Sequence, residues 1–143
     1  MASVVRTTRR VEFADTDMAG IVHFANFFRY MEAAEHEFLR AHGLSVAMDW
    51  EGERIGFPRV SASCDFHNPV RFEDVLDIDV GLARLGSKSL TFACTFLHKG
   101  GLVARGQLST VCCRLGPGQP LESIEIPAGI RDRLGATPSD AAS

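Results

Sequence analysis

The sequence lacks the features that define several broad protein classes. No apolar run reaches the roughly 18 residues of a membrane-spanning helix, and the opening segment MASVVRTTRRVEF has no apolar stretch behind its arginines. The formal net charge is -3 and the basic residues are dispersed, which argues against binding to nucleic acid. We therefore expect a cytoplasmic protein with no integral membrane segment and no nucleic-acid partner.

Patterns typical of metal sites and disulfides are missing as well. The cysteines lie in apolar stretches and form no C-x-x-C pair; they are Cys64, Cys94, Cys112 and Cys113. The five histidines form neither an H-x-H nor an H-E-x-x-H cluster. Buried free thiols and the absence of a metal are the expectation.

The length of 143 residues is enough for one domain that buries roughly two-thirds of its unfolded surface. No internal repeat or linker divides the chain. We expect a single domain over residues 1–135, followed by a flexible tail, GATPSDAAS, of which residues 136–143 lie beyond the domain.

One long amphipathic helix is predicted over residues 25–42. Its apolar residues recur at steps of three and four, and they are Phe27, Met31, Ala34, Phe38 and Leu39. Asn26 is a candidate N-cap, and Gly43 stands where a left-handed residue would end the helix. The broad aromatic stripe predicts a central position in the fold.

The rest of the chain is typical of antiparallel strands. In VLDIDVGLAR, apolar residues alternate with Asp77 and Asp79, which places one face against a core. The short segments LGSK and HKGG predict hairpins, and residues 45–56 form a polar connector. Strands are expected at residues 4–13, 58–67, 75–84, 89–98 and 102–115, with a short helix at 126–134. The fold class is α+β, with an antiparallel sheet that packs against the long helix.

The junction between the first strand and the helix carries two acids, Asp15 and Asp17. In one interpretation they are a helix cap and a solvated turn residue. In the other, Gly20 allows close approach of the backbone, and the free N–H groups of the helix start hold a developing oxyanion beside a carboxylate. His23 is a candidate base or a packing residue.

The stretch EFADTDMAGIVHFANFFRYMEAAEHEFLRAHGL, residues 12–44, resembles the opening of a known family. These are the hotdog-fold acyl-CoA thioesterases of the 4-hydroxybenzoyl-CoA thioesterase family, including the Tol-Pal-associated branch. The shared motif is D-x-D-x-x-G-[IV]-V-aromatic-x-x-N/S-[YF], followed by a long helix. Looser similarity in PVRFEDVLDIDV, GSKSLTF and IEIP extends the match to about nine-tenths of the chain.

The resemblance implies a hotdog fold, in which an antiparallel sheet wraps around the central helix, and thioester hydrolysis by Asp17. The backbone amide of Phe24 would polarise the thioester carbonyl. Asp17 would attack that carbonyl or activate water. No metal or redox cofactor is required, because the thiolate of coenzyme A is already a fair leaving group; coenzyme A itself is part of the substrate. A homodimer with active sites at the subunit interface is the minimum assembly, and a homotetramer is common in the family.

Binding residues follow from the same resemblance. Arg84, Lys88 and Ser89 would contact the phosphates of coenzyme A, although Gly86 and Ser87 replace two arginines of the aromatic-acyl branch. Gly20 and Asn26 match the motif and are candidate substrate contacts; Asn26 is also the candidate cap. The pair His23-Phe24 differs from the Trp-Tyr and Tyr-His of the two branches, so the acyl group stays open. Aromatic side chains suited to either a benzoyl or an aliphatic group are Phe24, Phe27, Phe28 and Phe57.

Two other functions remain open at this point. An acyl-carrier-protein thioesterase would need a basic docking patch, for which Arg6, Arg9, Arg10 and Arg29 are candidates. A non-catalytic acyl-CoA-binding module on the same fold would need no carboxylate at Asp17. A hotdog dehydratase is disfavoured, because no suitable His/Asp segment is present.

Overall fold

The structure is a computed structural model that describes residues 4–118 and 120–135. The elements are β1 (Val4–Arg10), the 3-10 helix η1 (Phe13–Asp15), α1 (Phe24–Ala41), β2 (Ala47–Trp50), β3 (Glu53–Gly56), β4 (Arg59–Phe66), β5 (Val75–Leu85), β6 (Ser89–His98), β7 (Gly101–Val111), β8 (Cys113–Arg114), β9 (Glu122–Ser123) and α2 (Ala128–Leu134). The α+β class is confirmed.

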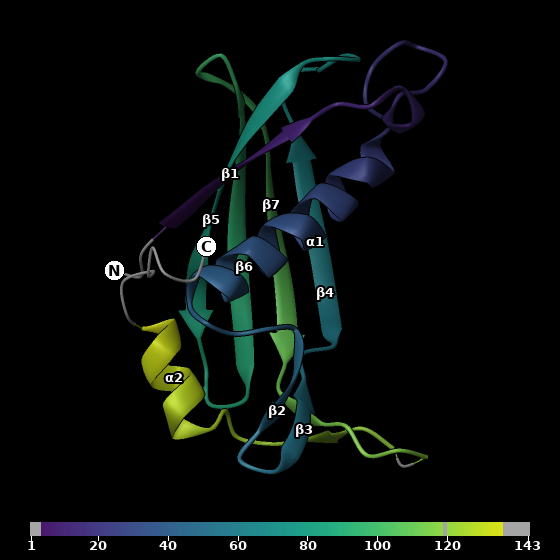
Figure 1. Cartoon of the computed structure of the whole chain (residues 1–143). Coiled ribbons are helices and arrows are strands. Elements are labelled where there is room, and N and C mark those ends of the chain that lie inside the picture. Colours follow the sequence, from purple (N-terminus) through teal and green to yellow (C-terminus); the bar gives the residue numbers. More distant parts are fainter. Residues whose placement is uncertain (1–3, 119, 136–143) are drawn as a thin grey trace.

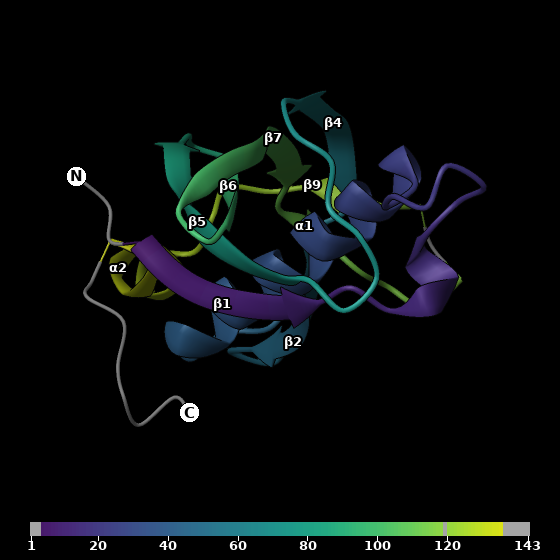
Figure 2. The same cartoon turned by 90° about the horizontal axis from the view of Figure 1, so that it is seen from above.

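Five antiparallel strands form the main sheet, in the order β1-β5-β6-β7-β4. Helix α1 lies across one face of this sheet (Figure 1), and the view from above shows that the sheet curls around the helix (Figure 2). The expected hairpins connect β5 to β6 and β6 to β7. This arrangement is the expected hotdog architecture.

The core lies between α1 and the concave face of the sheet. Phe27 and Phe38 on α1 make edge-to-face contacts with Phe96 and Phe92 on β6, at centroid distances of 5.3 and 5.5 Å. The alternation expected in β5 is confirmed, because Leu76, Ile78 and Val80 are all buried. The apolar stripe of the helix therefore fixes which face of α1 meets the sheet, and with it the direction in which the N-terminus of the helix points.

A second sheet, in the order β2-β3-β8-β9, corrects two expectations. The polar connector at residues 45–56 is a hairpin, since Glu51 and Gly52 both adopt positive φ and form a two-residue turn between β2 and β3. The strand expected over residues 102–115 is divided into β7 and β8, and β8 pairs with β3. Long-range pairing, which local sequence does not reveal, stabilises this sheet.

The ends of the elements differ slightly from the expectations. The first strand ends at Arg10 rather than Phe13, because Phe13 opens η1. Helix α2 confirms the short C-terminal helix, with Ile130 and Leu134 buried. Among the described residues, no helix is long and apolar enough to cross a membrane. The expected tail at residues 136–143 lies outside the described residues.

Strand β4 forms one edge of the main sheet and is the most exposed of its strands. Val60 is 64% exposed and Phe66 is 48% exposed. Unpaired backbone groups and exposed apolar side chains on one edge strand mark a surface where another chain can pair.

Candidate active site

Asp17 lies in a tight turn between η1 and α1. The Asp17 N–H donates to the carbonyl of Ile21, and the Gly20 N–H donates to the carbonyl of Asp17, both at 2.9 Å. Gly20 has a φ of 79°, a left-handed conformation that suits glycine. In the carboxylate, Oδ1 accepts a hydrogen bond from the Ala19 N–H at 2.9 Å. Oδ2 accepts none from any described residue, so one carboxylate oxygen is left without a hydrogen bond from the described part of the chain.

The start of α1 differs from its expected form. His23 is the N-cap, and its Nδ1 accepts a hydrogen bond from the Ala25 N–H at 3.1 Å. The expectation of an Asn26 cap is therefore wrong, because the helix begins at Phe24; the amide of Asn26 donates to the carbonyl of Asp15 at 2.8 Å. Within the described chain, the Phe24 N–H has no acceptor. The helix thus presents a free donor at its positive end.

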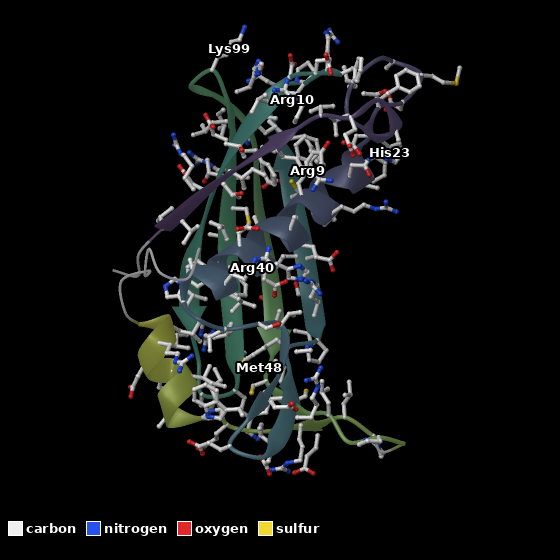
Figure 3. The ribbon with its side chains drawn as sticks, viewed as in Figure 1. Arg9, Arg10, His23, Arg40, Met48 and Lys99 are labelled. Atoms are coloured by element: carbon white, nitrogen blue, oxygen red, sulfur yellow. The ribbon has the colours of Figure 1, made fainter. Side chains whose placement is uncertain are left out.

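Capping also limits what His23 can do. Its ring stacks on that of Phe24 at a centroid distance of 4.7 Å, and its Nδ1 lone pair is occupied by the backbone. Figure 3 places the side chain at the N-terminal end of α1. A cap of this kind fixes the backbone conformation just before Phe24, so His23 acts on the geometry of the helix start.

A cavity of about 490 Å³ opens beside this turn. Asp17 lies at its wall together with the apolar side chains of Val22, Phe24 and Phe27. Its volume falls in the range typical of small-molecule sites, and its lining is mainly apolar with a few polar groups, as ligand pockets require. The candidate carboxylate and the aromatic side chains therefore face one space.

Further lining residues come from the end of β4 and from its connection to β5, which the sequence did not mark as part of a site. They are Phe66, His67, Asn68, Pro69 and Val70. This segment is anchored by the His67 N–H, which donates to Val103 at 2.8 Å, and by the Val22 N–H, which donates to Val70 at 2.9 Å. No local pattern in the sequence reveals that this segment crosses to Val22.

Asp15 has a different environment from Asp17. Its Oδ2 accepts hydrogen bonds from the Glu12 N–H at 2.9 Å and from the Tyr30 hydroxyl at 2.8 Å. Burial, together with this bond to Asp15, raises the pKa of Tyr30 far above its usual value. The two acids of the D-x-D segment therefore differ: the Asp15 carboxylate is hydrogen-bonded within the fold, and Asp17 lines the cavity.

The residues expected to bind coenzyme A phosphates lie elsewhere in the chain. Arg84 near the end of β5, Lys88 in the following turn and Ser89 at the start of β6 lie at the end of the sheet remote from the Asp17 turn (Figure 1). Arg84 and Lys88 are exposed, and neither lines the cavity. Within one chain, the structure therefore does not bring these three residues to the cavity.

Comparison with known proteins identifies the family. A family model described as the thioesterase-like superfamily matches residues 11–134. The chain belongs to this superfamily. The expectations of a hotdog fold and of a thioester hydrolase are confirmed.

Individual relatives of this thioesterase cover nearly the whole chain. The 4-hydroxybenzoyl-CoA thioesterase of Pseudomonas sp. (strain CBS-3) is 32% identical over 135 residues, which span 90% of this chain and 95% of that protein. The 1,4-dihydroxy-2-naphthoyl-CoA hydrolase of Thermosynechococcus vestitus is 29% identical over 134 residues, which span 93% and 90%.

A solved structure gives the same picture. It is an aspartate-to-asparagine mutant of 4-hydroxybenzoyl-CoA thioesterase in complex with 4-hydroxybenzoyl-CoA. It matches this thioesterase with a TM-score of 0.78 and 25% identity, covering 92% of this chain and 98% of that one. Among the described residues of this thioesterase, no group of three or more His, Cys, Asp or Glu side chains could hold a metal ion.

Proposed function

We propose that this thioesterase hydrolyses an acyl-CoA to the free acid and coenzyme A, with Asp17 as the catalytic carboxylate. The observation that carries the proposal is the free Oδ2 of Asp17 and the unpaired N–H of Phe24 beside one apolar cavity. A thioester carbonyl that accepts a hydrogen bond from the Phe24 N–H would develop negative charge at the positive end of α1. The named substrates of the two relatives support a coenzyme A thioester.

Two routes fit this geometry. In the first, an oxygen of Asp17 forms a bond to the acyl carbon, the carbon–sulfur bond breaks, and the thiolate of coenzyme A leaves; water then hydrolyses the mixed anhydride. In the second, Asp17 takes a proton from a water molecule that attacks the acyl carbon directly, the carbon–sulfur bond breaks, and the thiolate of coenzyme A leaves. Label in Asp17 after a single turnover in ¹⁸O-labelled water would demonstrate the first route, because only hydrolysis of the anhydride at the aspartyl carbon places it there. Neither route requires a cofactor.

The lining of the cavity favours an aromatic acyl group as the first class to test. Phe27 and Phe66 contact each other edge to face at 5.3 Å, and Phe24 lies 6.4 Å from Phe66. Such a set of rings can hold a flat acyl group by edge and face contacts. Of the aromatic side chains expected near the site, Phe28 and Phe57 are not among the lining residues.

Assembly as a homodimer through the free edge of β4 is part of the proposal. Pairing of two β4 strands would continue the main sheet and cover the exposed Val60 and Phe66. Within one chain, Lys88, Arg84 and Ser89 are remote from the cavity. In a dimer they could instead contact the phosphates of a coenzyme A bound in the cavity of the other subunit. Light scattering after size exclusion distinguishes a dimer from a homotetramer and from a monomer.

The cytoplasm, where coenzyme A thioesters are made and used, is the proposed location.

A hydrolysis screen tests the function. Purified protein is offered aromatic, short-chain and long-chain acyl-CoAs, and released thiol is measured. We expect hydrolysis of at least one class, and loss of hydrolysis in Asp17→Asn. Asp132→Asn is the matched control, because Asp132 is exposed on α2 at the far end of the molecule. Acyl-CoA binding without hydrolysis of any substrate would instead favour a non-catalytic binding module.

A further inference from the structure

We propose that Asp15 and Tyr30 are positioning residues, which fix the Asp17 turn relative to the Phe24 amide. This inference rests on the proposed function. It assigns no contact with substrate to either residue, and it gives the only tyrosine of the chain a role in catalysis.

Asp15 connects the turn to both sides of the helix start. Its carbonyl oxygen accepts hydrogen bonds from the His23 N–H at 2.9 Å and from the Asn26 side chain at 2.8 Å. These two donors flank Phe24 in the sequence. The residue two positions before Asp17 is therefore bonded to the backbone that carries the free amide.

The carboxylate of Asp15 adds two further contacts, one to η1 and one to α1. Oδ2 accepts from the Glu12 N–H, which closes the turn of η1, and from the hydroxyl of Tyr30, which lies further along α1. Helix α1 therefore contacts Asp15 through Tyr30, and through the bonds from His23 and Asn26 as well. Three contacts from one rigid helix to one residue leave the Asp17 turn little freedom to move against it.

The hydroxyl of Tyr30 is not needed for packing. The residue is 1% exposed, its ring contacts Phe27 edge to face at 5.8 Å, and Arg9 lies over the ring at 5.2 Å. Figure 3 shows Arg9 reaching from β1 toward this helix. A phenylalanine would keep all of these contacts, and it would bury no polar group. The hydroxyl therefore serves the bond to Asp15.

Small displacements at such a site have large kinetic effects. A misplacement of about 1 Å between reacting groups can cost about 100-fold in rate. Loss of the Asp15 carboxylate frees the turn from Tyr30 and from Glu12, whereas loss of the hydroxyl frees it from Tyr30 alone. The rate effects should follow that order.

The test compares Tyr30→Phe, Asp15→Asn and Asp15→Ala with the parent. We expect kcat to fall about 10-fold in Tyr30→Phe and about 100-fold in Asp15→Ala, with KM changed by less than about 2-fold. Asp15→Asn should retain most of the rate, because its amide oxygen can accept both hydrogen bonds. The double variant Tyr30→Phe with Asp15→Ala should be no slower than Asp15→Ala alone, since the two residues act as one unit.

The control separates positioning from loss of stability. Ile130→Val removes one buried methyl group from α2, at the opposite end of the molecule, and the small cavity that it leaves destabilises the fold. Its kcat should equal that of the parent. A parent-like kcat in Tyr30→Phe, or an equal fall in Ile130→Val, overturns the inference.

A second measurement needs no substrate. Hydrogen exchange of the His23 amide, which donates to Asp15, should accelerate at least about 10-fold in Tyr30→Phe and Asp15→Ala, but not in Ile130→Val. If the parent hydrolyses no acyl-CoA, the proposed function fails. The exchange measurement still tests whether Asp15 and Tyr30 hold the helix start in place. Unchanged exchange in both variants overturns the positioning role whatever the activity.

Discussion

The buried carboxyl group of Glu35 should make the free energy of unfolding depend on pH. This carboxyl lies on the buried face of α1 with no exposed surface and contacts the guanidinium of Arg59 on β4. Its Oε2 has no hydrogen-bond partner among the described residues. Burial therefore outweighs the attraction of Arg59 and raises the pKa of Glu35 from its usual 4.5 to about 7.

The sign of the effect follows from proton binding. In the unfolded chain the carboxyl loses its proton near pH 4.5, whereas the folded chain keeps it up to about pH 7. Folding stability from this group is complete below pH 4.5 and is lost as the pH rises through 7. At about 1.36 kcal/mol for each pH unit between these values, the loss amounts to about 3 kcal/mol.

The perturbation is Glu35→Gln, which keeps the shape of the side chain and removes its titration. Urea denaturation at fixed protein concentration, between pH 4 and pH 8, gives the free energy of unfolding of both proteins. The parent should lose about 3 kcal/mol relative to the variant across this range. The reasoning would be refuted if the difference in free energy of unfolding between the two proteins stayed constant, or grew in favour of the parent, as the pH rises. Either result would mean that Arg59 keeps the carboxylate charged in the folded state.

Two further predictions concern other buried contacts. Tyr30 is the only tyrosine, so absorbance at high pH reports it alone; burial and the bond to Asp15 should delay its ionisation well beyond pH of about 10, and a midpoint near 10 in the folded protein contradicts this. Gly106→Ala on β7 would place a methyl group against the sulfur of Met31 and 3.0 Å from the Ser63 carbonyl, so we expect a loss of about 1–3 kcal/mol in urea denaturation. Shortening Met31 to alanine in that background should make the combined loss smaller than the sum of the two, and full additivity would argue against the clash.

Local sequence patterns predict the helices and strands that depend only on the spacing of neighbouring residues. The stripe of α1 and the alternation of β5 depend on spacing alone, and the structure has both within two residues of the expected ends. The β2–β3 hairpin was missed because its turn is Glu51-Gly52, which is a weaker hairpin signal than Asn-Gly or Asp-Gly.

The site was predictable on one wall only. The D-x-D segment and the free helix start are adjacent in sequence, so their closeness in space could be predicted before the structure was known. His67 and Asn68 enter the cavity through a long-range backbone contact between Val22 and Val70, which has no local signature. His23 rather than Asn26 caps the helix because α1 begins at Phe24, which places Asn26 inside its first turn.

The most direct test of the account is the rate of thiol release from acyl-CoAs by the parent and by Asp17→Asn, with Asp132→Asn as the control. We expect the parent and the control to hydrolyse the same acyl-CoA at the same rate. Asp17→Asn should lose at least about 100-fold in kcat while its thermal unfolding is unchanged. Hydrolysis by Asp17→Asn at the parent rate would contradict the assignment of Asp17 as the catalytic carboxylate.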